Sequence, residues 1–192
     1  MTNKSARRPD ISAGLIHLTK ARVGSSALQV LQEILSSGKL LASGKKGFVK
    51  GSKPAVCFSE APLSGVPHLI GASEAYCQNK KDKEPYTTYG IAIGKSSVYE
   101  LGGRPAIYLP DDEAEWIPRE ERWRHVRFEP PSIDWTHERE WRLLGNLDLS
   151  KVAGLYVLVA TATEAKTIQS MDFPTKVLLR GVLPMDHLNT FL

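Results

Sequence analysis

Hydrophobic positions along the chain fall into short strand-like runs separated by segments with helical spacing. The clearest helix is predicted over residues 27–37, where apolar residues recur every three or four positions. Ser26 and Gln29 form a capping-box pattern at its start, and Gly38 supplies a left-handed stop after its end. Both ends of this helix are therefore specified by local sequence.

Runs rich in β-branched, aromatic and other apolar residues predict the strands. They cover residues 15–19, 55–59, 86–93, 104–109, 123–128, 154–160 and 177–181. A loosely helical stretch spans 63–77, and a second capping box, Thr161 with Glu164, predicts a helix after 154–160. Because the strands cluster in the middle of the chain, we expect an α+β fold with a central, mostly antiparallel or split β-sheet and flanking helices.

Length and composition favour one globular domain. The chain has 192 residues, of which 42% are hydrophobic and 24% charged. We expect a flexible basic arm over residues 1–12 and a single α+β domain over 13–192. The chain contains no apolar run of about 18 residues and residues 1–12 lack the apolar core of a signal peptide, so we expect a cytoplasmic protein without membrane contact.

The formal net charge of +4 makes a nucleic acid a candidate partner, although solvated surface loops explain the same composition. The basic residues gather in two loops, which hold Lys45, Lys46, Lys50 and Lys53, and then Lys80, Lys81 and Lys83. Cys57 and Cys77 are too far apart for a zinc motif or a disulfide framework, and the histidines lack ligand spacing. No metal is expected.

The most informative segment is the polar run over residues 135–144. If it is extended, alternation places three side chains on one face, namely Glu138, Glu140 and Arg142. The other face then holds His137, Arg139 and Trp141. Carboxylates two residues apart on a strand lie roughly 6.5–7 Å apart along the backbone, close enough to orient a substrate hydroxyl and stabilise a cationic transition state. The alternative is a salt-bridged surface worth about 0–1 kcal/mol per pair.

Several other polar residues occupy strand positions where site residues are often found. His17 lies in an apolar run and can hold a ribose or a phosphate, or serve as a satisfied structural residue. Ser59 and Glu60 end another run, and Tyr89 and Tyr108 can stack on a ring or fill the core. The motifs of serine hydrolases, phosphate loops and dinucleotide-binding turns are absent from the sequence.

Taken together, these motifs resemble the ADP-ribosyltransferase superfamily. Residues 14–20, the following helix and the Gly-Lys-Leu-Leu segment at 38–41 look like the start of DarT-like nucleic-acid ADP-ribosyltransferases and RNA 2′-phosphotransferases. The segments at 56–63, 89–93, 103–108 and 138–142 are similar to bacterial AbiGi-type abortive-infection proteins. The resemblance covers roughly residues 14–144.

This resemblance implies an ADP-ribosyltransferase-like fold with NAD as substrate, and the transfer of ADP-ribose to a nucleic acid or protein in phage defence or as a toxin. It implies NAD-binding roles for His17, Thr19, Ser59, Tyr89 and Tyr108, with one tyrosine stacking on nicotinamide. Glu138 or Glu140 would be catalytic, and the residues on the substrate side would be Glu60, Arg104, Arg139 and Arg142.

Two alternatives are compatible with the same residues. The first is a non-catalytic antitoxin or sensor of an abortive-infection system, with a partner protein, in which the charged residues form ion pairs. The second is a nuclease with magnesium held by Glu60, Glu138 and Glu140. The transferase hypothesis predicts that Glu138 and Glu140 share a cleft with His17, while Trp141 packs on the other side.

Overall fold

The computed structural model describes residues 11–44, 49–78, 80, 83–174 and 176–186. Most of the expected N-terminal arm, residues 1–10, lies outside these ranges, as do Lys45, Lys46 and Lys81 of the two basic loops.

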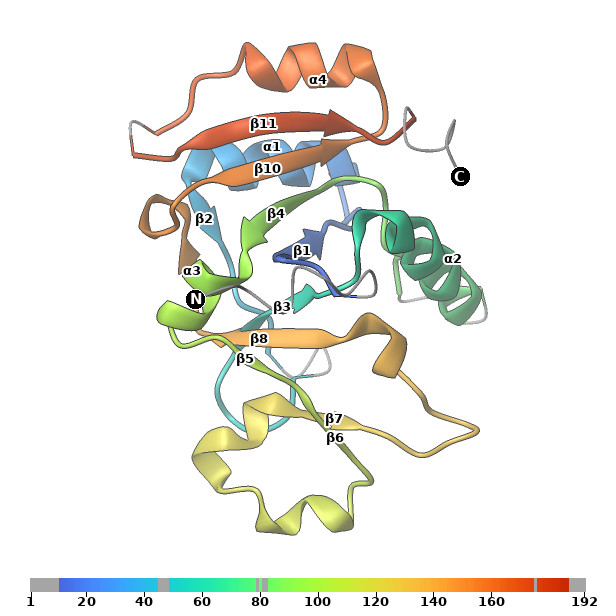
Figure 1. Cartoon of the computed structure of the whole chain (residues 1–192). Helices are drawn as coiled ribbons and strands as arrows, with labels where there is room; N and C mark the ends of the chain where they lie inside the picture. Colours follow the sequence, from blue (N-terminus) through green and yellow to red (C-terminus); the bar gives the residue numbers. More distant parts are fainter. Residues whose placement is uncertain (1–10, 45–48, 79, 81–82, 175, 187–192) are drawn as a thin grey trace.

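A seven-stranded sheet forms the centre of the fold, with the strand order β11-β10-β4-β1-β3-β8-β5 (Figure 1). Its strands are β1 (Gly14–Leu18), β3 (Ala55–Ser59), β4 (Gly90–Gly94), β5 (Arg104–Pro105), β8 (Glu140–Leu144), β10 (Leu155–Val159) and β11 (Leu179–Pro184). Neighbouring strands are antiparallel, except that β10 and β11 are parallel. The expected mixed α and β architecture with a mostly antiparallel central sheet and flanking helices is confirmed.

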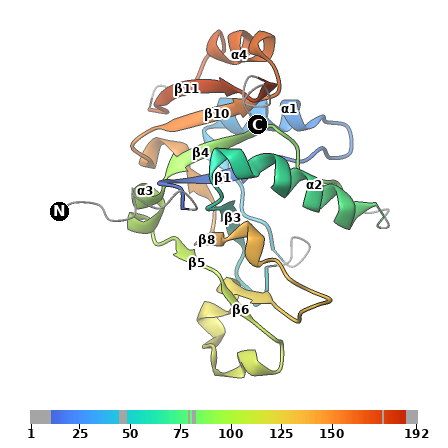
Figure 2. The ribbon, with the colours of Figure 1, turned by 45° about the vertical axis from the view of Figure 1, so that its right-hand side comes forward.

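Helices cover both faces of this sheet. On the first, which we call the α1 face, Leu15 and Phe58 pack with residues of α1 (Ala27–Ser37) and α4 (Ala162–Gln169). On the opposite α2 face, Ile16 and Leu18 pack against α2 (Val66–Cys77). Figure 2 shows α2 running beside β1, while α4 lies against β11. Alternation along β1 therefore divides the core into two layers.

A small lobe extends from the β5 edge of the sheet, at the bottom of Figure 1. It contains the parallel pair β6 (Ile107–Leu109) and β7 (His125–Arg127), with the 3-10 helices η4 (Glu113–Trp116) and η5 (Arg119–Arg124) between them. The strand expected over 104–109 is thus divided, since β5 pairs with β8 and β6 pairs with β7.

The remaining elements are short. They are β2 (Lys39–Leu40), which pairs with β9 (Leu147–Asp148), the helix α3 (Lys95–Glu100), and the 3-10 turns η3 (Leu63–Gly65), η6 (Thr136–Glu138) and η7 (Leu149–Lys151). Both expected capping boxes are present, and Gly38 adopts φ 65° at the end of α1. Among the described helices, none is long and apolar enough to cross a membrane.

The prediction of one extended strand over residues 135–144 is wrong. Its first half is the 3-10 turn η6, Arg139 takes a left-handed conformation with φ 48°, and β8 begins at Glu140. The carboxylate of Asp134 accepts hydrogen bonds from the Thr136 amide (2.9 Å) and hydroxyl (2.5 Å), which favours a turn over a strand. Glu138 therefore leaves the alternation on which its predicted neighbours were based.

Two glycines test the packing between β1 and β4. A Cβ at Gly90 would overlap the carbonyl oxygen of His17, whereas a Cβ at Gly71, in α2, would meet nothing within 4 Å. We expect Gly90→Ala to lower the free energy of unfolding by about 1–3 kcal/mol or more. Gly71→Ala should raise it by about 0.5–1 kcal/mol, because alanine favours a helix. Urea unfolding of both variants measures the difference, and equal effects would contradict the close strand contact.

Candidate functional site

Cross-strand register determines which polar residues share the α2 face. Ser59 lies opposite both Ile16 of β1 and Glu140 of β8, and Cys57 lies opposite Arg142. Residues that are direct cross-strand partners point to the same side of a sheet. The Glu140 and Arg142 side chains therefore lie on the face covered by α2.

Glu140 and Arg142 form a buried ion pair, with exposed fractions of 7% and 2%. Arg142 Nε donates to Glu140 Oε1 at 2.7 Å, and a second guanidinium nitrogen donates to Oε2 at 3.2 Å. The third nitrogen donates to the carbonyl oxygens of Trp123 (2.7 Å) and His125 (3.1 Å) in the small lobe. All three guanidinium nitrogens of Arg142 are therefore hydrogen-bonded, and one of them joins the small lobe to the sheet.

Glu138 lies at the end of η6, two residues before Glu140, and is partly buried. Burial, reinforced by the negative charge of Glu140, raises the pKa of Glu138 to about 7. Lys20 and Arg142 act in the opposite direction. Within the described ranges, the Glu138 carboxylate accepts no hydrogen bond, whereas its backbone carbonyl accepts one from Ser59 Oγ at 2.6 Å. The bond from Ser59 therefore fixes the η6 turn and leaves the Glu138 carboxylate able to accept a hydrogen bond from a ligand.

Three residues that the sequence did not single out surround this carboxylate. The Lys20 ammonium lies 4.0 Å from the centroid of the Tyr86 ring. Burial lowers the pKa of Lys20, which the charges of Cys77 and Glu138 partly offset, and burial raises the pKa of Tyr86 well above its usual range. Cys57, whose pKa burial also raises, completes the group. Lys20 directly follows Thr19 in the segment 14–20 that carries the family resemblance, and this proximity was the available signal.

We call this group the acidic cluster, and it consists of Lys20, Cys57, Tyr86, Glu138, Glu140 and Arg142. Tyr108 adjoins it, because its hydroxyl oxygen accepts a hydrogen bond from the Glu140 amide at 2.8 Å. Burial raises the pKa of Tyr108, so its hydroxyl stays protonated near neutral pH. Five predicted site residues thus meet here: Ser59, Tyr108, Glu138, Glu140 and Arg142.

His17 does not join them. Its partner on β4 is Ile91, which belongs to the α1-face core, and its ring lies edge-on to Phe58 with centroids 6.0 Å apart. Nδ1 lies 2.8 Å from the carbonyl oxygen of Cys57, and burial lowers the pKa of the ring. The expectation that His17 shares a cleft face with Glu140 is therefore not met. The physical reason is register, since Ile16 pairs with Ser59 and the next residue must point away.

Thr19 and Tyr89 also make structural contacts away from the cluster. Thr19 Oγ1 donates to the carbonyl oxygens of Ala27 (3.1 Å) and Tyr89 (3.0 Å). The Tyr89 hydroxyl donates to Glu164 Oε1 at 2.8 Å, and burial together with this contact raises the pKa of Tyr89 to about 12. These interactions fasten the starts of α1 and α4 to the sheet.

Glu60 lies beside Trp141 on the α1 side of β3 and β8. Its carboxylate accepts a hydrogen bond from Trp141 Nε1 at 2.8 Å and pairs with Lys95. Trp141 packs against the α1-face core, as expected. Glu60 thus points away from Glu138 and Glu140, and in the described segments no group of three His, Cys, Asp or Glu side chains is placed to hold a metal ion.

The two remaining predicted arginines take part in backbone hydrogen bonds, Arg104 through its side chain and Arg139 through its carbonyl oxygen. Arg104 donates to the carbonyl oxygens of Tyr99 (2.9 Å) and Gly103 (2.7 Å), and its guanidinium stacks over the Tyr99 ring at 4.2 Å. The Arg139 carbonyl accepts a hydrogen bond from the Glu60 amide at 3.2 Å, which fixes the left-handed turn before β8.

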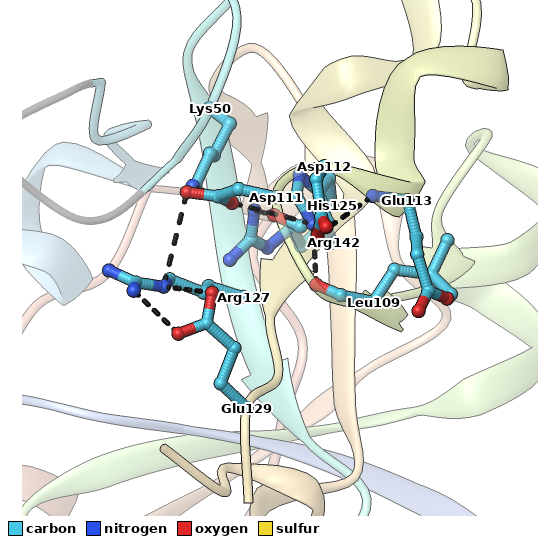
Figure 3. A network of polar contacts seen from close by, with 9 residues as sticks. All are labelled: Lys50, Leu109, Asp111, Asp112, Glu113, His125, Arg127, Glu129 and Arg142. Carbon is cyan, nitrogen blue, oxygen red and sulfur yellow. Dashed lines mark hydrogen bonds and ion pairs between the residues drawn. The ribbon is translucent and has the colours of Figure 1, made fainter. Parts of the chain in front are cut away.

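A separate hollow of about 470 Å³ lies in the small lobe. Lys50, Asp111 and His125 are among the residues that line it. In the polar network of Figure 3, Lys50 pairs with Asp111, and Arg127 pairs with Glu129 nearby. His125 Nε2 lies 2.9 Å from the Leu109 carbonyl oxygen, and the Lys50 contact lowers the pKa of Asp111. Because these charges neutralise one another, the acidic cluster is the better candidate site.

No protein-family model matches this chain, and neither a curated protein nor a solved structure shows significant similarity to it. The family resemblances of the sequence motifs are thus still predictions.

The ion pair can be tested by a double-mutant cycle. Arg142→Met leaves the Glu140 carboxylate buried without its cation and should lower the free energy of unfolding by about 3–5 kcal/mol. Adding Glu140→Gln removes that unpaired charge, so the double variant should recover part of the loss. Chemical denaturation of the four proteins measures the coupling. Strictly additive losses would show that the pair does not interact as described.

The raised pKa of Glu138 predicts how stability depends on pH. The folded protein binds the proton of the Glu138 carboxyl more tightly than the unfolded chain does. The resulting contribution to the free energy of unfolding is therefore complete below the pKa of the unfolded chain and is lost as pH rises through about 7. Between pH 5 and pH 8, the free energy of unfolding of wild type should therefore fall by on the order of 2 kcal/mol more than that of Glu138→Gln. Urea titrations across that range measure this, and parallel profiles would contradict the raised pKa.

Proposed function

We propose that the chain is an ADP-ribosyltransferase-like enzyme that cleaves NAD and transfers ADP-ribose to a nucleic acid or a protein, in phage defence or as a toxin. The observation that carries this proposal is the Glu138 carboxylate. It is partly buried, has a pKa of about 7 and, within the part of the chain that the structure describes, accepts no hydrogen bond. A carboxylate of this kind can face a developing positive charge without first giving up a partner.

The reaction needs such a group. The bond between the nicotinamide nitrogen and the ribose carbon breaks, nicotinamide leaves with the electron pair, and the ribose carbon acquires oxocarbenium character. The acceptor forms a new bond to that carbon and releases a proton to a base. Ionised Glu138 stabilises the positive charge, and the stabilisation is larger in a partly buried site than in water.

In this proposal the two glutamates have different roles. Glu138 would contact the substrate, whereas Glu140, which pairs with Arg142, would set the local charge. Ser59 positions the η6 turn through its bond to the Glu138 carbonyl. We assign to Tyr86, whose ring contacts the Lys20 ammonium, the stacking role that the family resemblance implies for Tyr89 or Tyr108.

His17 and Thr19 then act from the other face of β1. The His17 ring is hydrogen-bonded to the Cys57 carbonyl oxygen. The Thr19 hydroxyl donates to carbonyl oxygens at the start of α1 and at Tyr89. In this proposal both residues fix the strand that delivers Lys20 to the acidic cluster, and neither contacts the reacting atoms.

Two alternatives receive unequal support. The engagement of Glu140 with Arg142 is what a non-catalytic antitoxin or sensor would show, so this reading is the second candidate. A magnesium-dependent nuclease would need Glu60 to converge with Glu138 and Glu140. Glu60 instead pairs with Lys95 and Trp141 on the opposite side.

Nicotinamide release from NAD tests the proposal. We expect Glu138→Gln to reduce kcat about 100-fold to 1000-fold, the range seen when one stabilising group of a transition state is removed. Exposed Glu100 provides the matched control, and Glu100→Gln should retain full activity. The assay is run with single-stranded DNA, RNA or a protein extract as acceptor. No release by wild type under any of these conditions would reject the transferase and favour the binding protein.

A further inference from the structure

Aromatic and basic side chains gather beside Glu138, and the proposed NAD chemistry does not account for them. We call this group the stacking surface, and it consists of Tyr76, Lys80, Lys83, Trp135 and His137. It is formed by the end of α2, the segment that follows it, and the turn that leads into η6. Two segments about 55 residues apart in the sequence thus meet at the edge of the acidic cluster.

Ring contacts give this surface its order. The Trp135 ring contacts both of the others, with its centroid 4.7 Å from Tyr76 at 77° and 6.0 Å from His137 at 40°. The Lys80 ammonium lies 3.5 Å from the Tyr76 centroid. His137 and Lys80 are exposed, while Tyr76 and Trp135 are partly exposed. The surface therefore presents ring faces and positive charge together.

The basic side chains of the stacking surface have other contacts than Lys50 of the first basic loop. Lys50 of the first loop is paired with Asp111 in the small lobe. Lys80 instead contacts the face of an aromatic ring, and Lys83 lies near enough to Lys20 to lower the pKa of that ammonium. Lys20, Lys80 and Lys83 thus form a basic strip that leads to Glu138.

We propose that the stacking surface binds single-stranded nucleic acid. Bases stack on Trp135 and His137, and backbone phosphates lie against Lys80 and Lys83, since aromatic rings alternating with cations suit unpaired bases on a charged backbone. A duplex keeps its base faces stacked inside, and an acidic peptide would use the lysines but leave the rings without a function. As the acceptor site the surface rests on the proposed function; as a binding surface it does not.

The position of the surface explains how an acceptor reaches the carboxylate. His137 directly precedes Glu138 in η6, so a base stacked on Trp135 and His137 lies at the approach to the Glu138 carboxylate. Lys20, two residues after the end of β1, flanks the same approach with its ammonium over Tyr86. In this arrangement the nucleic acid lies against Lys80 and Lys83, and Lys20 lies at the end of the basic strip next to the Glu138 carboxylate.

Fluorescence anisotropy with labelled single-stranded 12-mers of DNA and RNA, without NAD, tests the binding. Trp135→Ala and His137→Ala should each weaken it by about 10-fold to 100-fold, as expected for loss of base stacking. Trp116→Ala is the matched control, because Trp116 is 67% exposed in the small lobe, and it should bind like wild type. Lys80→Ala should lower the slope of log affinity against log salt concentration by about one, whereas Lys151→Ala should leave that slope unchanged.

Exposed His137 gives a variant that does not depend on the packing of Trp135, and circular dichroism of each variant checks the fold. Equal affinity of wild type, His137→Ala and Trp135→Ala would overturn the proposal, as would equal binding of a duplex. Full competition by polyglutamate would also overturn it and indicate a protein partner. Binding without nicotinamide release would keep the surface and reject the transferase, while release unaffected by oligonucleotides and by these variants would reject the surface as acceptor site.

Discussion

The arrangement of the site depends on one buried charge, the guanidinium of Arg142. Its exposed fraction is 2%, so every donor must find an acceptor within the protein, and the acceptors come from two parts of the fold. Glu140 neutralises the charge from the same strand, and the carbonyl oxygens of Trp123 and His125 come from the small lobe. One side chain therefore both neutralises Glu140 and joins the lobe to the sheet, and its strand, β8, begins two residues after η6 ends.

This ion pair also explains why Glu138 differs from its neighbour. The acidic cluster holds two carboxylates, and Arg142 engages one of them through two hydrogen bonds. Lys20 opposes the second charge, but it lies over Tyr86 and is not bonded to Glu138. Burial together with the remaining repulsion from Glu140 shifts the pKa of Glu138 towards neutrality. The two glutamates thus differ in their contacts, because the Arg142 guanidinium donates hydrogen bonds to Glu140 and acts on Glu138 only through its charge.

Local signals in the sequence predicted much of the fold and less of the site. The capping boxes and Gly38 identified α1 and the start of α4, because those interactions occur within four residues of one another. The turn at η6 depends partly on Asp134, which is local, and partly on the bond from Ser59 to Glu138, which spans 79 residues. The orientation of His17 depends on the pairing of β1 with β3, and the approach of Lys20 and Tyr86 to Glu138 depends on the packing of α2. Alternation along one strand contains none of this information.

The turn that breaks the expected strand also determines where His137 and Glu138 point. In an uninterrupted strand, His137 and Glu138 would point to opposite faces of the sheet, and the backbone would separate the imidazole ring from the carboxylate. In the 3-10 turn, His137 stays exposed beside Trp135 while Glu138 reaches the acidic cluster. The left-handed Arg139 then returns the chain to the strand in time for Glu140 to meet Arg142. One irregular turn therefore connects the outer surface, the available carboxylate and the buried ion pair.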